Sequence, residues 1–144
     1  MDKNIVDLGN VDLTLSGRAG AVQILRGLSL SVPAGQSVAI VGPSGSGKTS
    51  LLMLIAGLER STGGKVTVAG HNLSGLSQDE LAIMRGAEIG IVFQSFHLVP
   101  TMTAIENVAL PHEFHDRDAG FDAARAALAE VGLTHRETHF PAQL

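Results

Sequence analysis

The sequence has 144 residues, the length of about one domain. A hydrophobic content of 44% with 17% charged residues indicates a folded chain with a buried core and excludes a disordered one. The net charge of −4 argues against a nucleic-acid-binding protein, and the lack of cysteine excludes disulfides and Cys-based metal sites.

Membrane-spanning and secreted classes are also disfavoured. No apolar run approaches the ~20 residues that cross a bilayer, and the longest, residues 51–56, is short. The N-terminus is not followed by the apolar segment of a secretory signal. We therefore expect a cytoplasmic chain that would reach a membrane only by binding another protein.

The first part of the chain predicts strands. Residues 11–15 and 28–32 alternate apolar and polar side chains, as strands with one buried face do. A turn at residues 33–35 separates the second of these from the apolar run 37–41, so we expect a hairpin between them. Two further strands are expected at residues 65–68, which alternate again, and at the wholly apolar residues 89–93.

Four segments predict helices, the first at residues 49–58. Ser77 followed by Glu80 is a capping-box pattern, which should begin a helix that ends near Arg85, before Gly86. Another is expected at residues 103–110. The last is an amphipathic helix ended by a glycine C-cap, and its apolar stripe and cap are Phe121, Ala124, Leu128, Val131 and Gly132.

Residues 42–49, GPSGSGKT, match the P-loop pattern G-x-x-x-x-G-K-[ST]. Its glycines let successive N–H groups turn inward as a nest for phosphate oxygens, at the positive end of the helix that follows. Lys48 is placed to reach the β- and γ-phosphates, and the Thr49 hydroxyl to bind Mg²⁺. The alternative is a glycine-rich turn without a ligand, but the apolar strand before the motif and the apolar helix after it favour nucleotide binding.

Hydrolysis needs more than a P-loop, because an Asp at the end of an apolar strand must help to hold Mg²⁺. The apolar runs after the P-loop are followed by Gln94, Gly70 and Pro111 instead. The guanine-reading pattern N-K-x-D is also missing. The residues therefore predict triphosphate binding without a complete hydrolytic set.

Four stretches together resemble the ATP-binding-cassette (ABC) transporter ATPase family. They are VGPSGSGKTSLL at residues 41–52, ILRGLSLSVPAGQSVAI at 24–40, IGIVFQSFHLVPTMTAIENVALP at 89–111 and HFPAQL at 139–144. The third stretch is most similar to the lipoprotein-release, macrolide-export and YbbA-like subclass. The resemblance implies an α/β P-loop NTPase fold of ABC type, with an antiparallel entry sheet, an incomplete parallel core sheet and the start of a helical subdomain.

The resemblance also implies how the chain is divided. Residues 1–144 would be the N-terminal portion of one ABC ATPase domain. Residues 1–94 would form the nucleotide-binding core, and residues 95–144 the exit of the Q-loop and an incomplete helical subdomain.

ATP and Mg²⁺ are the ligands that the resemblance implies. Thr49 and Gln94 would coordinate Mg²⁺, and Ser50 would lie beside the α-phosphate. Leu15 takes the position of an aromatic residue that stacks on adenine in the family, so we expect weaker selection of adenine. The implied phosphate-binding set is Gly42, Pro43, Ser44, Gly45, Ser46, Gly47, Lys48, Thr49 and Ser50.

The implied partners are a transmembrane permease, met by about residues 95–108, and a second copy of the complete domain. Its signature sequence, L-S-G-G-Q, would complete each P-loop in the homodimer. The complete protein would be the ATPase of an exporter, cytoplasmic and peripheral to the inner membrane. Leu144 would be the first residue of the signature, so this chain is expected to be truncated before it and not to hydrolyse ATP alone.

Two other functions stay open. A complete small P-loop phosphotransferase would need an Arg-rich lid and a Walker-B Asp, and neither is found in the sequence. A non-catalytic module that binds a permease without turnover would share the nucleotide site but not the missing catalytic half.

Overall fold

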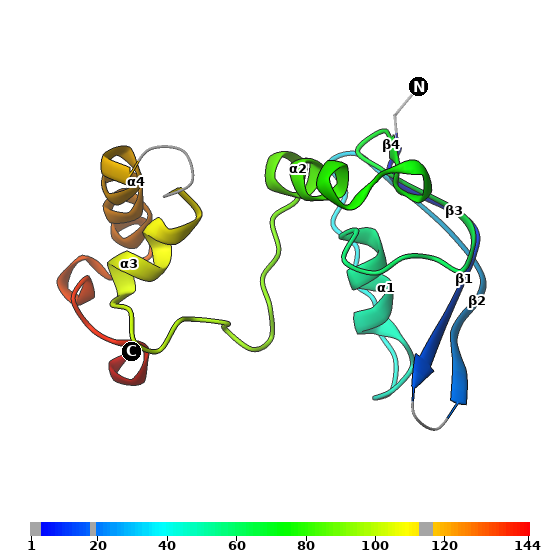
Figure 1. Ribbon diagram of the computed structural model, residues 1–144, viewed down its shortest axis with the longest axis horizontal. Coiled ribbons are helices and arrows are strands. Elements are labelled where there is room, and N and C mark those ends of the chain that lie inside the picture. The colour runs from blue at the N-terminus through cyan, green and yellow to red at the C-terminus, as the bar shows by residue number, and fades with distance from the viewer. Residues whose placement is uncertain (1–3, 18–19, 113–116) are drawn as a thin grey trace. The chain divides into compact units, whose positions relative to one another are not determined.

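The structure is a computed structural model that describes residues 4–17, 20–112 and 117–144 (Figure 1). The chain divides into two compact units, Met1–Ile91 and Val92–Leu144. None of the helices in the described part of the chain is both long and apolar enough to cross a membrane.

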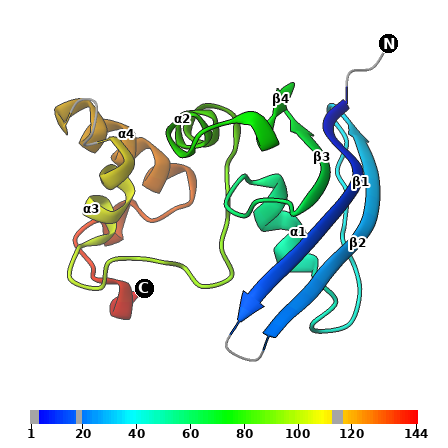
Figure 2. The same cartoon turned by 45° about the vertical axis from the view of Figure 1, so that its right-hand side comes forward.

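The first unit is built on a four-stranded antiparallel sheet in the order β2-β1-β3-β4 (Figure 2). The predicted strands at residues 11–15, 28–32 and 65–68 are confirmed within its three longer members. The strand bounds are β1 Asn4–Gly17, β2 Gly20–Pro33, β3 Gly63–Val68 and β4 His71–Asn72.

The expected hairpin between residues 28–32 and 37–41 is wrong. β2 pairs with β1, with Leu8 opposite Leu30 and Val11 opposite Leu28. The chain does turn after Pro33, but residues 37–41 and 89–93 form no strand in the described part of the chain, and no parallel pair occurs there. A strand needs a neighbour for its backbone N–H and C=O groups, and neither run has one within these residues.

Two helices pack on this sheet, α1 (Lys48–Ile55) and α2 (Gln78–Glu88) (Figure 2). The shared core contains Leu8, Val11 and Leu13 of β1, Val66 and Val68 of β3, Leu51 and Leu54 of α1, and Leu81 and Met84 of α2. Burying several Leu and Val side chains, each worth about 1.5–3 kcal/mol, stabilises the sheet against the helix that carries the P-loop lysine.

The capping box that begins α2 is confirmed, since the Ser77 hydroxyl accepts from Glu80 N–H and Glu80 accepts from Ser77 N–H. Its predicted end at Arg85 is wrong by three residues. Gly86 stays in the helix, and the last turn closes through a 3.1 Å bond from Ile89 N–H to the Arg85 carbonyl. The Arg85 guanidinium also donates to the carbonyl of Gly57 at 2.8 Å, which ties α2 to the end of α1.

The second unit contains α3 (Ala104–Ala109) and α4 (Arg117–Glu130), which share an apolar core of Ala104, Ile105, Ala109, Ala124 and Leu128. Thr103 and Glu106 cap α3 with a second capping box, which the T-x-x-E pattern of the sequence also encodes. Gly132 ends α4 at φ +73°, as predicted. Val131 was expected in the apolar stripe but is 68% exposed beyond the end of the helix.

Short 3₁₀ turns complete the two units. They are η1 (Leu73–Gly75), η2 (Leu110–His112), η3 (Thr134–Arg136) and η4 (Pro141–Gln143).

Candidate functional site

The P-loop residues form a tight turn that leads directly into α1. Gly45 and Gly47 have φ values of +80° and +86°, a region that favours glycine. Ser46 N–H donates to the Pro43 carbonyl at 3.3 Å, and Leu51 N–H donates to the Gly47 carbonyl at 2.9 Å. The chain therefore reverses and enters the helix within a few residues, which brings residues 42–50 together.

Gly47 is required for a second reason, which is its contact with β2. A Cβ at this position would lie 3.1 Å from Cγ2 of Ile24 and 3.4 Å from the Ile24 carbonyl oxygen. The start of α1 thus lies against the sheet at a position where a side chain would crowd Ile24. Sequence reasoning missed this role of Ile24, because the contact joins residues that are far apart in the chain.

The Lys48 ammonium is held over the loop by backbone groups. It donates to the carbonyl oxygens of Gly42 at 2.9 Å and Pro43 at 2.7 Å, and lies 3.5 Å from the Ser46 hydroxyl oxygen. These acceptors are neutral, so they orient the ammonium without cancelling its charge. The positive charge is left at the mouth of the loop, where an anion could meet it.

The N-terminus of α1 differs from those of α2 and α3. The two other helices each begin with a capping box that supplies a carboxylate to the first turn. α1 has no side-chain cap and no acidic residue in its first turn. Its first N–H groups and positive dipole end are therefore open to an anionic ligand, as phosphate-binding helices require.

The remaining candidate residues lie at different distances along the chain from this turn. Thr49 is exposed and Ser50 is half-buried in the first turn of α1. Leu15 is half-buried in β1, packs against the core of the first unit and pairs with Val22 of β2. Gln94 is exposed and belongs to the second unit, so its part in binding Mg²⁺ stays a prediction.

The donor set fits a magnesium ion that is held mainly by nucleotide. No group of three or more His, Cys, Asp or Glu side chains that could hold a metal occurs in the part of the chain that the structure describes. Mg²⁺ commonly takes only one or two protein ligands and completes its shell with phosphate oxygens and water. A Thr49 hydroxyl at the start of α1, beside the phosphate nest, suits that arrangement.

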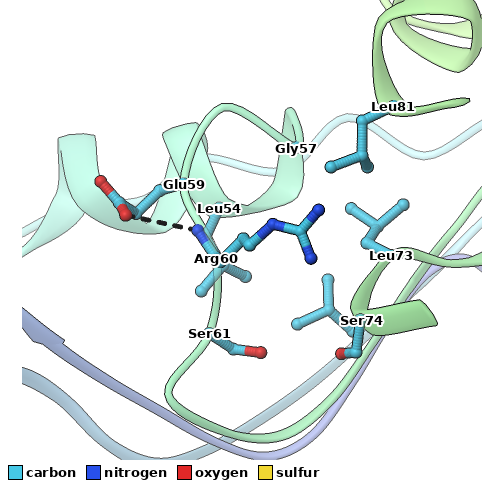
Figure 3. A pocket seen from close by; sticks show the side chains of 9 residues that line it. Leu54, Gly57, Glu59, Arg60, Ser61, Leu73, Ser74 and Leu81 are labelled. Atoms are coloured by element: carbon cyan, nitrogen blue, oxygen red, sulfur yellow. Dashed lines mark hydrogen bonds between the residues drawn. The ribbon is translucent and has the colours of Figure 1, made fainter. Parts of the chain in front are cut away.

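A separate small hollow lies between the end of α1, β3 and α2 (Figure 3). Its volume is about 70 Å³ and its floor is apolar, formed by Leu54, Val66, Leu73 and Leu81. The Arg60 guanidinium extends between Gly57 and Leu73 and donates to the Leu76 carbonyl at 2.7 Å. Pockets for small-molecule ligands measure about 300–1,000 Å³, so this hollow is too small for a nucleotide.

Comparisons of the chain with known protein families, proteins and structures all indicate the same family. A family model described as "ABC transporter" matches residues 25–144. The chain is 38% identical over 144 residues to "Uncharacterized ABC transporter ATP-binding protein YbbA" of Escherichia coli (strain K12). The matched region covers 99% of this chain and 63% of that protein. It is 44% identical over 123 residues to "Lipoprotein-releasing system ATP-binding protein LolD" of Xanthomonas campestris pv. campestris (strain 8004), covering 84% of this chain and 52% of that protein.

Longer relatives and solved structures agree. The chain is 42% identical to "Pyoverdine export ATP-binding/permease protein PvdT" of Pseudomonas fluorescens (strain Pf0-1), covering 100% of this chain and 22% of that protein. A dimeric post-hydrolysis state of the ATP-binding cassette MJ0796, bound to ADP and Pi, matches with a TM-score of 0.86 at 36% identity, covering 96% of this chain and 62% of that chain. These similarities confirm the predicted ABC-type α/β fold and subclass, while the parallel core sheet that the resemblance implied is not formed among the described residues. The chain spans less than two thirds of the length of these proteins.

Proposed function

Because this chain belongs to the ABC transporter family, we propose that it is the Mg·ATP-binding part of the ATPase component of a membrane exporter. One observation carries the proposal: the helix that follows the glycine-rich loop begins without a capping side chain, beneath an ammonium that neutral carbonyls orient. That combination suits a polyphosphate, because it offers N–H donors, a helix dipole and a positive charge on one side.

The proposed roles follow the chemistry of each side chain. Lys48 binds the β- and γ-phosphates, while the loop N–H groups from Gly42 to Thr49 surround the phosphate oxygens. The Thr49 hydroxyl and the Gln94 amide oxygen coordinate Mg²⁺, which prefers hard oxygen ligands. The Ser50 hydroxyl lies beside the α-phosphate.

The proposal covers binding by this chain and not hydrolysis. The 144 residues contain no L-S-G-G-Q sequence, and after the P-loop no run of four apolar residues is followed by Asp. The printed names of two relatives describe an ATP-binding/permease protein and a lipoprotein-releasing system, and the solved cassette is described as dimeric. By analogy, we propose that residues 95–108 contact a permease at the cytoplasmic side of the inner membrane, and that the working ATPase is a homodimer.

A titration with a fluorescent ATP analogue and Mg²⁺ tests the proposed site. Lys48→Ala should weaken binding by about tenfold or more, because a charge-assisted contact to phosphate is worth about 1.5–3 kcal/mol. Lys65→Ala is the matched control, since Lys65 is an exposed lysine on β3, and should change the affinity by less than about twofold. Equal binding by the wild type and Lys48→Ala would contradict the proposal.

The adenine side of the site is proposed to be poorly selective. Leu15 offers an aliphatic surface, and the chain contains neither Tyr nor Trp. The missing stacking contribution is about 1–3 kcal/mol per base. Competition titrations should therefore give similar affinities for ATP and GTP, and a strong preference for ATP would contradict the role given to Leu15.

A further inference from the structure

The Asn107 side chain, half-buried on α3, uses both ends of its amide to hold the segment that precedes this helix. Its Oδ1 accepts from Val99 N–H at 2.7 Å. Its Nδ2 donates to the carbonyl oxygens of Val99 at 3.1 Å, Met102 at 3.0 Å and Thr103 at 3.0 Å. One side chain thereby fixes both ends of residues 99–103 to α3.

The same end of α3 is bonded to the C-terminal part of the chain. Ala104 N–H donates to the His139 carbonyl at 2.8 Å, and Ile105 N–H donates to the Glu137 carbonyl at 3.0 Å. The Glu137 carboxylate also lies 3.6 Å from Nε of Arg125 on α4. Two of the N–H groups that a helix start normally leaves free are therefore satisfied by residues about thirty positions away.

Residues 92–98 are held much less firmly than residues 99–103. They contain no helix or strand, and Phe96 is 85% exposed. The described contact within this segment is the edge-to-face packing of Phe93 on His97, with ring centroids 4.9 Å apart. His97 has a φ of +51°, which is uncommon for a residue with a side chain. The change from a loosely held segment to a fixed one falls at Val99, where the Asn107 bonds begin.

We infer that Asn107 is a positioning residue, which locks residues 99–103 to residues 137–139 so that the two segments move as one body. Moving residues 99–103 alone would break several half-buried hydrogen bonds and leave their polar groups without partners, which is unfavourable. A displacement of residues 99–103 is therefore passed through α3 to residues 137–139. The contact of residues 99–103 with a permease rests on the proposed function. The bonds that join residues 99–103 to α3 and α3 to residues 137–139 do not depend on it.

Amide hydrogen exchange, measured by NMR on the whole 144-residue chain without nucleotide, tests the lock. Asn107→Leu removes the side-chain bonds at similar size, and should raise the exchange of Val99, Met102, Ala104 and Ile105 by about tenfold or more. The amides of Gly132 and Leu133, which close the C-terminus of α4 at 3.0 and 2.8 Å, should stay protected. Asn72→Leu is the matched control: Asn72 caps η1 in the first unit by accepting from Ser74 N–H, and its loss should leave all of these amides unchanged.

A second variant separates positioning from folding. Asn107→Asp keeps the acceptor but loses the donors, so Val99 should stay protected while Met102, Ala104 and Ile105 exchange faster. Faster exchange of Val99 alone in Asn107→Leu would show a local contact and overturn the inference. Equal acceleration at Gly132 and Leu133 would show that Asn107 is needed for folding and would also overturn it. The nucleotide titration tests the proposed function separately from the role of Asn107. If the wild type failed to bind ATP, the proposed function would be contradicted, but the exchange result would be unaffected.

Discussion

The Nζ atom of Lys48 donates a 2.7 Å hydrogen bond to the carbonyl oxygen of Pro43, so the P-loop orients its own lysine. Lys48→Arg should weaken binding of the ATP analogue by about tenfold, although the charge is kept. The planar guanidinium is bulkier than an ammonium and cannot reproduce its point contacts with the Gly42 and Pro43 carbonyls. Affinity within about twofold of the wild type would show that charge alone is sufficient.

Gly64 lies against the backbone of β1, and a Cβ there would overlap the carbonyl group of Asn10. Its φ is also +78°, which is strained for any residue with a side chain. Gly64→Ala should therefore lower the free energy of unfolding by about 3 kcal/mol or more, measured by urea denaturation. Gly75→Ala is the control, because a Cβ at Gly75 meets no atom within 4 Å, and it should change stability by less than about 0.5 kcal/mol.

The features that the sequence predicted correctly are those whose cause is local. The glycine-rich turn that leads into α1 and the Ser77 capping box depend on residues within a few positions of each other, so a pattern is sufficient to find them. Strand pairing depends on distant partners, and residues 28–32 pair with β1, whose bulges near Val11 interrupt the alternation. The contact of Gly47 with Ile24 and the bonds from α3 to residues 137–139 are likewise non-local, and no pattern in the sequence indicates them.

The end of α2 was also predicted wrongly from a local signal, Gly86, and this residue gives a prediction for the direction of a stability change. It continues α2 instead of ending it, and a Cβ there meets no atom within 4 Å. Gly86→Ala should therefore raise the free energy of unfolding by about 0.5–1 kcal/mol. Gly132→Ala should have the opposite effect, because Gly132 has a φ of +73° at the end of α4. Destabilisation by Gly86→Ala in urea denaturation would restore the predicted helix end.

The two capping boxes predict a dependence of stability on pH. Ser77 N–H, and then the Ser77 hydroxyl, hold the pKa of Glu80 below its ordinary value of 4.5, and Thr103 does the same for the pKa of Glu106. A lowered pKa means that the folded state favours the carboxylate. The stabilisation is therefore present above pH 4.5 and is lost as the pH falls through the lowered values.

Carboxyl chemical shifts followed by NMR should place both pKa values below 4.5. Glu80→Gln with Glu106→Gln keeps neutral capping groups, so this variant should lose less stability than the wild type between neutral and acidic pH. An identical acid dependence in the two proteins would show that these carboxylates do not contribute.

The two apolar runs that have no strand partner among the described residues, 37–41 and 89–93, predict self-association of the 144-residue chain. Val41 is 87% exposed and Val92 is 100% exposed, and extended apolar backbone without a neighbour is a template for pairing with another chain. Size-exclusion chromatography with light scattering should show the mean mass rising with protein concentration. Val41→Thr with Val92→Thr should move this rise to higher concentration, whereas Ile83→Thr, at a 73% exposed position on α2, should not. A monodisperse monomer with one sharp melting transition would contradict the prediction, because it would mean that the unpaired runs are protected within the chain itself.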